Sequence, residues 1–177
     1  MRTIKYSTLK EPVLIISPNF KFIASRPAYF IAFGFGSGLS PFAPGTAGTL
    51  AAFPIYALLV LLGLSAPMFF ALIAGLFLIG VWASHETGRA LGVADYGGIV
   101  WDEIVAFLAI LYFTPPSVAW FIAAFFIFRI FDIWKPFPIR YFDTHIKNGF
   151  GVMFDDALAA VYSIALIQGL VWMISKL

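Results

Sequence analysis

Apolar segments alternate with short polar stretches along most of the chain, at residues 47–64, 67–83, 104–113, 117–131 and 157–174. At about 1.5 Å per helical residue, the first, second and last can cross a hydrocarbon core of about 30 Å if it thins slightly. The segment 104–113 is too short to cross, and Thr114-Pro115-Pro116-Ser117 breaks the helix after it. The pattern predicts three full spans plus a helical hairpin over 104–131.

The composition supports a membrane location for this bundle. A hydrophobic fraction of 62% in 177 residues and a mean hydropathy of +0.95 leave more apolar surface than one small core can hide, so lipid must cover the rest. The predicted fold is therefore an all-α integral membrane helical bundle of one domain, residues 1–177. The absence of cysteine excludes disulfides, thiolate zinc sites and cysteine phosphatases. A net charge of +2 without a Lys/Arg run gives no support to nucleic-acid binding.

The N-terminal residues are basic, with five Lys/Arg against one Glu in residues 1–26. We interpret residues 1–32 as an interfacial arm on the cytoplasmic side, ahead of a helical core at 33–177; a partly disordered tail is equally compatible. If 104–131 is a hairpin, counting spans from this arm places the charged stretches 84–103 and 132–156 on that same cytoplasmic face. If 104–131 is one span, the two stretches lie on opposite faces.

Charged residues are scarce, at 11% of the chain, and they concentrate between two apolar segments. Residues 128–156 hold four acids and four bases: Asp132, Asp143, Asp155, Asp156, Arg129, Lys135, Arg140 and Lys147. Acids at the edge of a hydrocarbon layer are costly, and they persist mostly where they have a function. Mixed acids and bases here predict a site that binds a divalent metal together with an anion.

Two acidic pairs are candidate metal ligands. Asp102 and Glu103 open the helical run at 104, where the helix dipole alone favours carboxylates, but they also suit Mg²⁺, which prefers oxygen ligands. Asp155 and Asp156 directly precede the last apolar segment, where Asp155 either caps the helix or binds the metal. Asp95 lies in a turn-like context and is a weaker candidate.

The bases are spaced to share a helix face. Arg129 and Asp132 stand at i and i+3, and Lys135 is three residues further along the same face. This pattern suits an anion beside a metal, and the alternative is a surface ion-pair ladder. Asp143 reaches the same space only if residues 136–150 fold back.

A Gly-rich stretch, residues 34–49, is predicted to be a loop that feeds the first apolar helix, with Thr46 or Thr49 as its N-cap. Such a loop ahead of a helix N-terminus can cradle an anion, although no nucleotide-binding motif is present. A plain membrane-entry loop is the alternative.

Four stretches in order, GFGSGLSPFAPGTAGTLAAFP, GIVWDE, FRIFDIWKPFPIRYFD and GFGVMFDD, resemble the phosphatidylglycerophosphatase A family over about residues 33–165. The resemblance implies a Mg²⁺-dependent phosphatase of the bacterial inner membrane that converts phosphatidylglycerol phosphate to phosphatidylglycerol. Ala106 and Ala160 stand where the family usually has glycine. The family's functional residues fall on the acids Asp95, Asp102, Glu103, Asp132, Asp143, Asp155 and Asp156, the bases Arg129 and Lys135, and the glycine loop Gly36, Ser37, Gly38, Pro44, Gly45 and Thr46.

From these residues we hypothesise a mechanism. Asp102, Glu103, Asp155 and Asp156, with Asp95 as a further candidate, hold Mg²⁺. Arg129 and Lys135 neutralise the phosphoryl oxygens. Asp132 activates the nucleophile, or itself attacks phosphorus. A membrane transporter or divalent-ion permeation protein is the alternative function, but the apolar segments carry no charge before Arg129, which favours chemistry at the surface. A non-catalytic scaffold is a third possibility.

Overall fold

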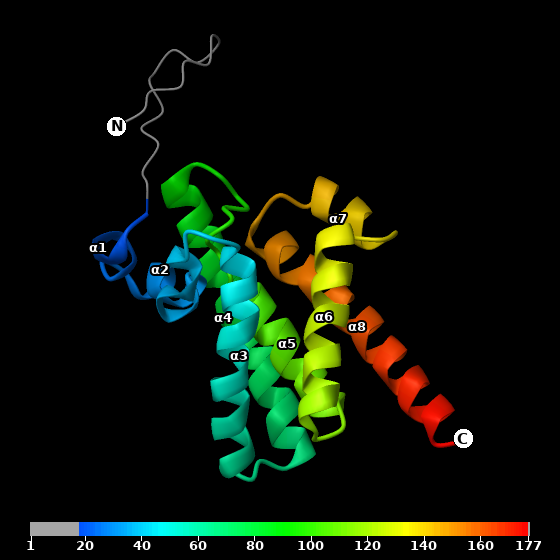
Figure 1. The fold of residues 1–177 in the computed structure, drawn as a ribbon. Coiled ribbons are helices and arrows are strands. Elements are labelled where there is room, and N and C mark those ends of the chain that lie inside the picture. The colour runs from blue at the N-terminus through cyan, green and yellow to red at the C-terminus, as the bar shows by residue number, and fades with distance from the viewer. Residues whose placement is uncertain (1–17, 177) are drawn as a thin grey trace.

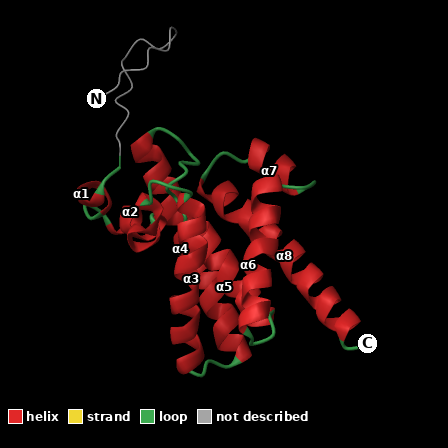
Figure 2. Ribbon diagram, viewed as in Figure 1, coloured by secondary structure: helices red, strands yellow, loops and turns green. Residues whose placement is uncertain are grey.

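The computed structural model describes residues 18–176, and every regular element in that range is a helix (Figure 2). Two short helices, α1 and α2, precede a 3₁₀ segment, and the longer helices follow in up-and-down order. The elements are α1 (Phe20–Ile23), α2 (Pro27–Ala32), η1 (Gly34–Leu39), α3 (Pro44–Leu61), α4 (Ala66–Leu91), α5 (Trp101–Phe113), α6 (Val118–Trp134), α7 (Ile139–His145) and α8 (Gly149–Ile174).

The long helices place the charged connections between the described helices at one end of the bundle. Figure 1 shows the α3–α4 and α5–α6 turns at the lower end, whereas the α4–α5 loop, α7 and the starts of α3 and α8 lie at the upper end. Residues 104–131 therefore form the predicted hairpin, which turns at Thr114–Ser117, and the single-span alternative is wrong. We call the upper end of Figure 1 the polar end.

Three helices are long and apolar enough to cross a membrane: α3, α4 and α8. Only 17%, 17% and 22% of their most apolar windows are buried inside the protein. Large side chains such as Leu61 on α3, Leu78 on α4 and Trp172 on α8 are exposed, which is costly in water but favourable in lipid. The predicted all-α membrane fold is confirmed.

Helix α5 forms the centre of the bundle. It packs against α3, α4, α6 and α8, and nine of its 13 residues are buried. Phe107 lies at the core of this packing, with its ring 5.7 Å from Phe128 of α6 and 5.2 Å from Phe53 of α3. Ala106 and Ala160 both belong to the same buried cluster, as expected of small residues at helix contacts.

The helix boundaries differ from the predicted ones at the two places that matter most for the site. α3 begins at Pro44 without a side-chain cap, because proline suits the first helical position; the predicted Thr46 or Thr49 cap is wrong. α8 begins at Gly149, where the Asn148 side chain accepts hydrogen bonds from two backbone N–H groups, each at 3.0 Å. Asp155 is therefore not a cap and lies in the second turn of α8.

The Gly-rich stretch is more ordered than a loop. Residues 34–39 form 3₁₀ turns that are joined where Phe35 (φ 58°) and Gly36 (φ 111°) adopt positive φ, the region that glycine tolerates. The preceding α1 and α2 contribute buried Ile23, Ala28 and Ala32, and α2 packs on α4. Residues 1–17 of the predicted arm lie outside the described residues.

Candidate active site

A cavity of about 380 Å³ opens at the polar end of the bundle. Its wall comes from the start of α3, the α4–α5 loop, the start of α5, the end of α6 and the second turn of α8. Segments that are far apart in the sequence thus meet at one place. The lining residues are Ala43, Pro44, Gly45, Asp95, Gly97, Ile99, Asp102, Glu103, Arg129, Asp132, Ile133, Lys135, Asp155 and Asp156.

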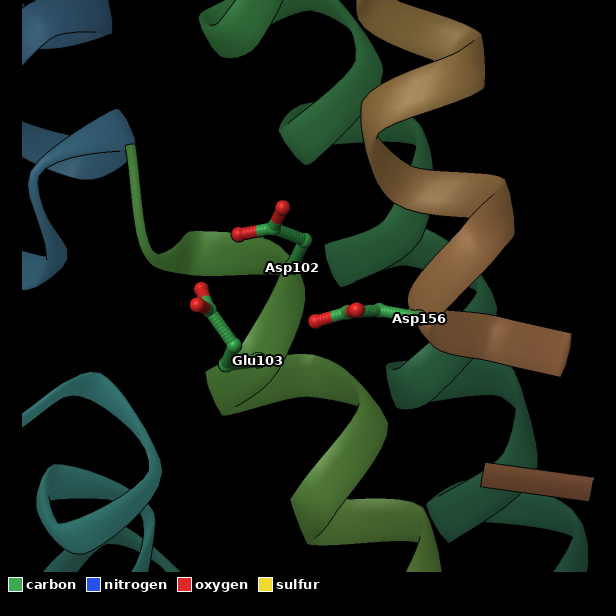
Figure 3. A group of neighbouring side chains, drawn as sticks. All are labelled: Asp102, Glu103 and Asp156. Atoms are coloured by element: carbon green, nitrogen blue, oxygen red, sulfur yellow. The ribbon is translucent and has the colours of Figure 1, made fainter. Parts of the chain in front are cut away.

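Three carboxylates converge on this cavity. Figure 3 shows Asp102 and Glu103 on α5 and Asp156 on α8 pointing toward a common space, and one oxygen from each lies within 4.8 Å of the others. Asp102 and Asp156 are only 8% and 3% exposed. Within residues 18–176, Asp102 Oδ1, Glu103 Oε2 and Asp156 Oδ2 have no hydrogen-bond partner. Buried carboxylates without partners are unfavourable, and a divalent cation that prefers oxygen ligands would satisfy them.

Arg129 connects this acidic cluster to α6. Its Nη1 lies 2.6 Å from Asp132 Oδ2, 3.7 Å from Glu103 Oε1 and 3.5 Å from the Thr49 hydroxyl. The Arg129 and Asp132 side chains are 15% and 13% exposed, so solvent screens the pair only partly. The predicted i, i+3 pair on α6 therefore forms, and it faces the cavity.

Lys135 reaches the cavity from a position that the helix pattern did not predict. α6 ends at Trp134, and Lys135 is a left-handed C-cap (φ 46°), so it does not continue the Arg129–Asp132 face. Its Nζ contacts the Asp155 carboxylate and lies 3.0 Å from Asp143 Oδ1. Residues 136–150 do fold back, because α7 packs on α8 and brings Asp143 to Lys135.

Charge pairing keeps Lys135 and Asp143 ionised. Burial works to lower the pKa of Lys135, but Asp155 and Asp143 raise that pKa well above its ordinary value. Partial burial works to raise the pKa of Asp143, but Lys135 and then Lys147 hold that pKa below its ordinary value. The cavity thus keeps a fixed positive charge at the Lys135 ammonium.

The first turn of α3 comes unusually close to the charged residues. A Cβ on Gly45 would lie 3.1 Å and 3.2 Å from the two Nη atoms of Arg129 and would overlap Glu103 Oε1. Only glycine fits there without moving both side chains. The N–H groups of Gly45 and Thr46 have no intrahelical partner at this helix start, so the positive end of α3 faces the cavity.

The predicted glycine-loop residues divide into two groups. Pro44 and Gly45 line the cavity, whereas Thr46 and the stretch Gly36–Gly38 are not among its lining residues. The Ser37 hydroxyl donates to the Gly34 carbonyl at 2.9 Å, and Gly38 lines a neighbouring hollow. Asp95 is an exposed residue of the cavity rim and lies outside the three-carboxylate cluster.

Five residues at the cavity were not predicted as members of the site: Ala43, Gly97, Ile99 and Ile133 line it, and Thr49 lies against Arg129. Thr49 is fully buried; it donates to the Gly45 carbonyl at 2.9 Å and lies against Arg129. Gly97 lines the cavity from the α4–α5 loop. The interval of four residues between Gly45 and Thr49, one helical turn, is the signal that places Thr49 on the cavity side of α3.

Comparison with known proteins finds matches over most of the chain. The model of the family described as phosphatidylglycerophosphatase A matches residues 30–171. A phosphatidylglycerophosphatase A of Haemophilus influenzae is 44% identical over 160 residues, which cover 89% of this chain and 98% of the relative. The Escherichia coli protein of that name is 42% identical over 151 residues, covering 78% and 80%. A putative phosphatidylinositol-3-phosphatase of Bacteroides thetaiotaomicron is 43% identical over 158 residues, covering 84% and 98%. No solved structure matches.

Proposed function

The chain belongs to the phosphatidylglycerophosphatase A family of phosphatases, and on this premise we propose that it hydrolyses phosphatidylglycerol phosphate to phosphatidylglycerol with Mg²⁺ in the polar-end cavity. The observation that carries the proposal is the meeting, in one cavity, of three carboxylates within 4.8 Å of one another and the cations Arg129 and Lys135. Acids for a metal beside bases for an anion are what a metal-assisted phosphomonoesterase needs.

The residues present fit a hard divalent cation. Asp102, Glu103 and Asp156 supply oxygen donors, each with one oxygen that is buried and without a partner among the described residues. Asp155 has one oxygen committed to Lys135, while its Oδ1 is buried without a partner in the same part of the chain. We propose the first three as the ligand set, with Asp155 as a fourth ligand through Oδ1. When bound, Mg²⁺ supplies charge neutralisation at the phosphoryl group and acidifies a bound water.

The bases and the α3 N-terminus bind the phosphate oxygens in this proposal. Arg129 is held by Asp132 and faces the cavity beside Gly45. Lys135 is held by Asp155 and Asp143. Both cations are fixed before the substrate arrives, so little reorganisation is needed when negative charge shifts onto the phosphoryl oxygens in the transition state.

Asp132 is the residue that we assign to the proton transfer. It lines the cavity, and its Oδ2 is oriented by Arg129 at 2.6 Å. The oxygen of water forms a bond to phosphorus, the bond from phosphorus to the glycerol oxygen breaks, and the proton released by water is accepted by Asp132. Asp132 then gives this proton to the leaving glycerol oxygen, so the products are phosphatidylglycerol and inorganic phosphate.

The charge distribution supports a cytoplasmic polar end. Within residues 18–176, the far-end turns at 62–65 and 114–117 carry no charge, whereas the bases Arg89, Arg129 and Lys135 lie at the polar end. Positive residues accumulate on the cytoplasmic side of bacterial membranes. We therefore place the cavity in the cytoplasmic headgroup layer, with the lipid tails beside the exposed apolar faces of the spans. This placement also disfavours ion permeation, which requires ionisable groups along the spans.

The test is phosphate release from phosphatidylglycerol phosphate by the purified protein in detergent, with Mg²⁺ and with EDTA. Asp132→Asn and Asp156→Asn are compared with Glu86→Gln, a matched acid-to-amide change in a surface ion pair with Arg89. We expect EDTA and both cavity variants to lower release by about a hundredfold or more, since each removes a group that acts in the transition state. Glu86→Gln should stay within about twofold, as changes to exposed ion pairs have small effects.

Release that is insensitive to EDTA would refute the metal mechanism. Full activity of the folded Asp132→Asn and Asp156→Asn variants would refute the residue assignments. No release from intact lipid by folded wild-type protein would refute the proposed substrate.

A further inference from the structure

A second hollow, of about 410 Å³, lies beside the active-site cavity. The two share Pro44 and Gly97 as lining residues. The rest of its wall comes from Pro18, from Phe33 at the end of α2, from the Gly-rich segment, including Gly38 and Ser40, and from Tyr96 and Gly98 of the α4–α5 loop. Apart from these two shared residues, no residue of this hollow has a role in the mechanism proposed above.

The lining of this hollow suits an uncharged, hydroxyl-bearing group. Among the described residues that form it there is no Asp, Glu, Lys, Arg or His, so a charged group would find no side chain to pair with, which is costly. Tyr96 brings a hydroxyl group, and the Ser40 hydroxyl, which donates its hydrogen to the Phe42 carbonyl at 2.7 Å, can accept a hydrogen bond from a ligand. The Phe33 and Tyr96 rings, with centroids 6.0 Å apart, supply apolar surface. A largely apolar wall with a few polar groups is typical of sites that orient a small neutral ligand.

Backbone also contributes to this wall. The chain at Gly38 and at Gly98 passes so closely that a Cβ on Gly98 would lie 2.9 Å from the Gly38 carbonyl oxygen and 2.6 Å from the Phe33 ring. Glycine at both positions keeps side chains away from this part of the hollow. The Gly38 N–H already donates to the Phe33 carbonyl at 3.0 Å, so the peptide C=O groups there are the ones that can accept from ligand hydroxyls.

From the neighbouring positions of the two hollows, we infer that this one receives the glycerol linker of the substrate, the hydroxyl-bearing carbon chain between the terminal phosphate and the rest of the lipid. The inference rests on the proposed function. With the terminal phosphate held by Arg129 and Lys135, the atoms bonded to it must lie at the edge of the active-site cavity. The neighbouring uncharged hollow provides space for them and hydroxyl partners in Ser40 and Tyr96.

Gly97 is the position where this inference can be tested most directly. It lines both hollows, and a Cβ placed there would meet no described atom within 4 Å. Because Gly97 lines both hollows, a large side chain there would add bulk at their junction, and its Cβ would not clash with the described residues. Gly169, on α8, also has open space at its Cβ position and is absent from both walls, so Gly169→Leu is the matched control.

The experiment measures KM for phosphatidylglycerol phosphate and the inhibition constant of inorganic phosphate, which needs the phosphate site alone. For Gly97→Leu we expect KM to rise at least about tenfold, because the leucine side chain would keep the glycerol linker out of the hollow. The inhibition constant should stay within about twofold. Tyr96→Phe keeps the ring and removes one hydroxyl, so its KM should rise about threefold to tenfold. Gly169→Leu should match the wild type in both constants.

Parallel rises in KM and in the inhibition constant would overturn the inference, because they would show damage to the phosphate site. Unchanged KM in both Gly97→Leu and Tyr96→Phe would also overturn it. If Gly97→Leu fails to fold, Tyr96→Phe decides alone. A wild-type protein that releases no phosphate would instead refute the proposed function, so the two failures are distinguishable.

Discussion

Gly45→Ala separates the stability of the fold from the geometry of the site. In most helices this change is favourable, since alanine is preferred over glycine by up to about 1 kcal/mol. Here the new methyl group would lie 3.1 Å from Arg129 Nη1 and would overlap Glu103 Oε1. Both atoms are at the ends of side chains, so they can move at small cost to the free energy of unfolding. The predicted effect is therefore on activity and not on stability.

The size of the effect follows from the displacement. The Glu103 carboxylate must retreat by about 1 Å to restore ordinary contact, and a misplacement of that size costs about a hundredfold in rate. We expect kcat to fall about a hundredfold, equivalent to about 2.7 kcal/mol of transition-state stabilisation, while the melting temperature in detergent stays the same or rises slightly.

The matched control is Gly75→Ala on α4, where a Cβ would meet no described atom within 4 Å. It gains the same helix preference, so we expect an equal or higher melting temperature and unchanged phosphate release. If Gly45→Ala is as active as Gly75→Ala, Glu103 and Arg129 do not need the positions seen here, and our account of the cavity is wrong.

Three further predictions concern the charged residues. Asp102→Asn removes one of three crowded buried carboxylates. The metal-free protein should therefore gain about 1 kcal/mol of stability and melt about 2–4 °C higher, as expected for a protein of this size. The rise in melting temperature that Mg²⁺ causes should disappear, and a rise that persists would exclude Asp102 as a ligand. Arg129→Lys loses the forked contact that a guanidinium can make with a phosphate, so kcat should fall about a hundredfold while the fold loses less than about 1 kcal/mol of stability. Phosphate release measures kcat and thermal unfolding measures stability; a kcat equal to that of the wild type would contradict a direct role of Arg129. Lys135→Met leaves Asp155 without its cation and Asp143 with Lys147 alone. It should cost about 1–3 kcal/mol at pH 7, reduced from the fully buried case because the lysine side chain is 23% exposed. Because Lys135 holds the pKa of Asp143 below its ordinary value, that pair stabilises the fold above about pH 4 and loses its effect on further acidification; the difference between variant and wild-type melting temperatures should therefore shrink from pH 7 to pH 3, and a constant difference would refute the pairing.

The arrangement of spans could be predicted because it follows from a few strong signals. Apolar segment lengths and the Pro115-Pro116 break are enough to distinguish a hairpin over 104–131 from a single span, and the structure contains the hairpin. Counting the spans also predicts that Asp102, Arg129 and Asp156 lie at one end of the bundle, and all three line one cavity.

Local details of the site were not predicted where neighbouring residues determine at which position a helix begins or ends. Asn148 is a better N-cap than a residue seven positions later, so α8 starts early and moves Asp155 into its second turn. Lys135 leaves the α6 face because Pro136 follows it and the helix cannot continue. The contact of Gly45 with Glu103 and Arg129 depends on how α3, α5 and α6 pack together, which no local pattern encodes.

The central position of α5 has a consequence for how the protein responds to its bilayer. With 13 residues, α5 is about 20 Å long, shorter than a hydrocarbon core of about 30 Å. Because α3, α4, α6 and α8 surround it, it is shielded from hydrophobic mismatch. α8, with 26 residues and exposed apolar side chains, is long enough to tilt when the lipid thickness changes. Asp102 and Glu103 are thus carried by a helix that other helices surround, and Asp155 and Asp156 by one that also faces lipid, so we expect acyl-chain length to influence the spacing of the acids.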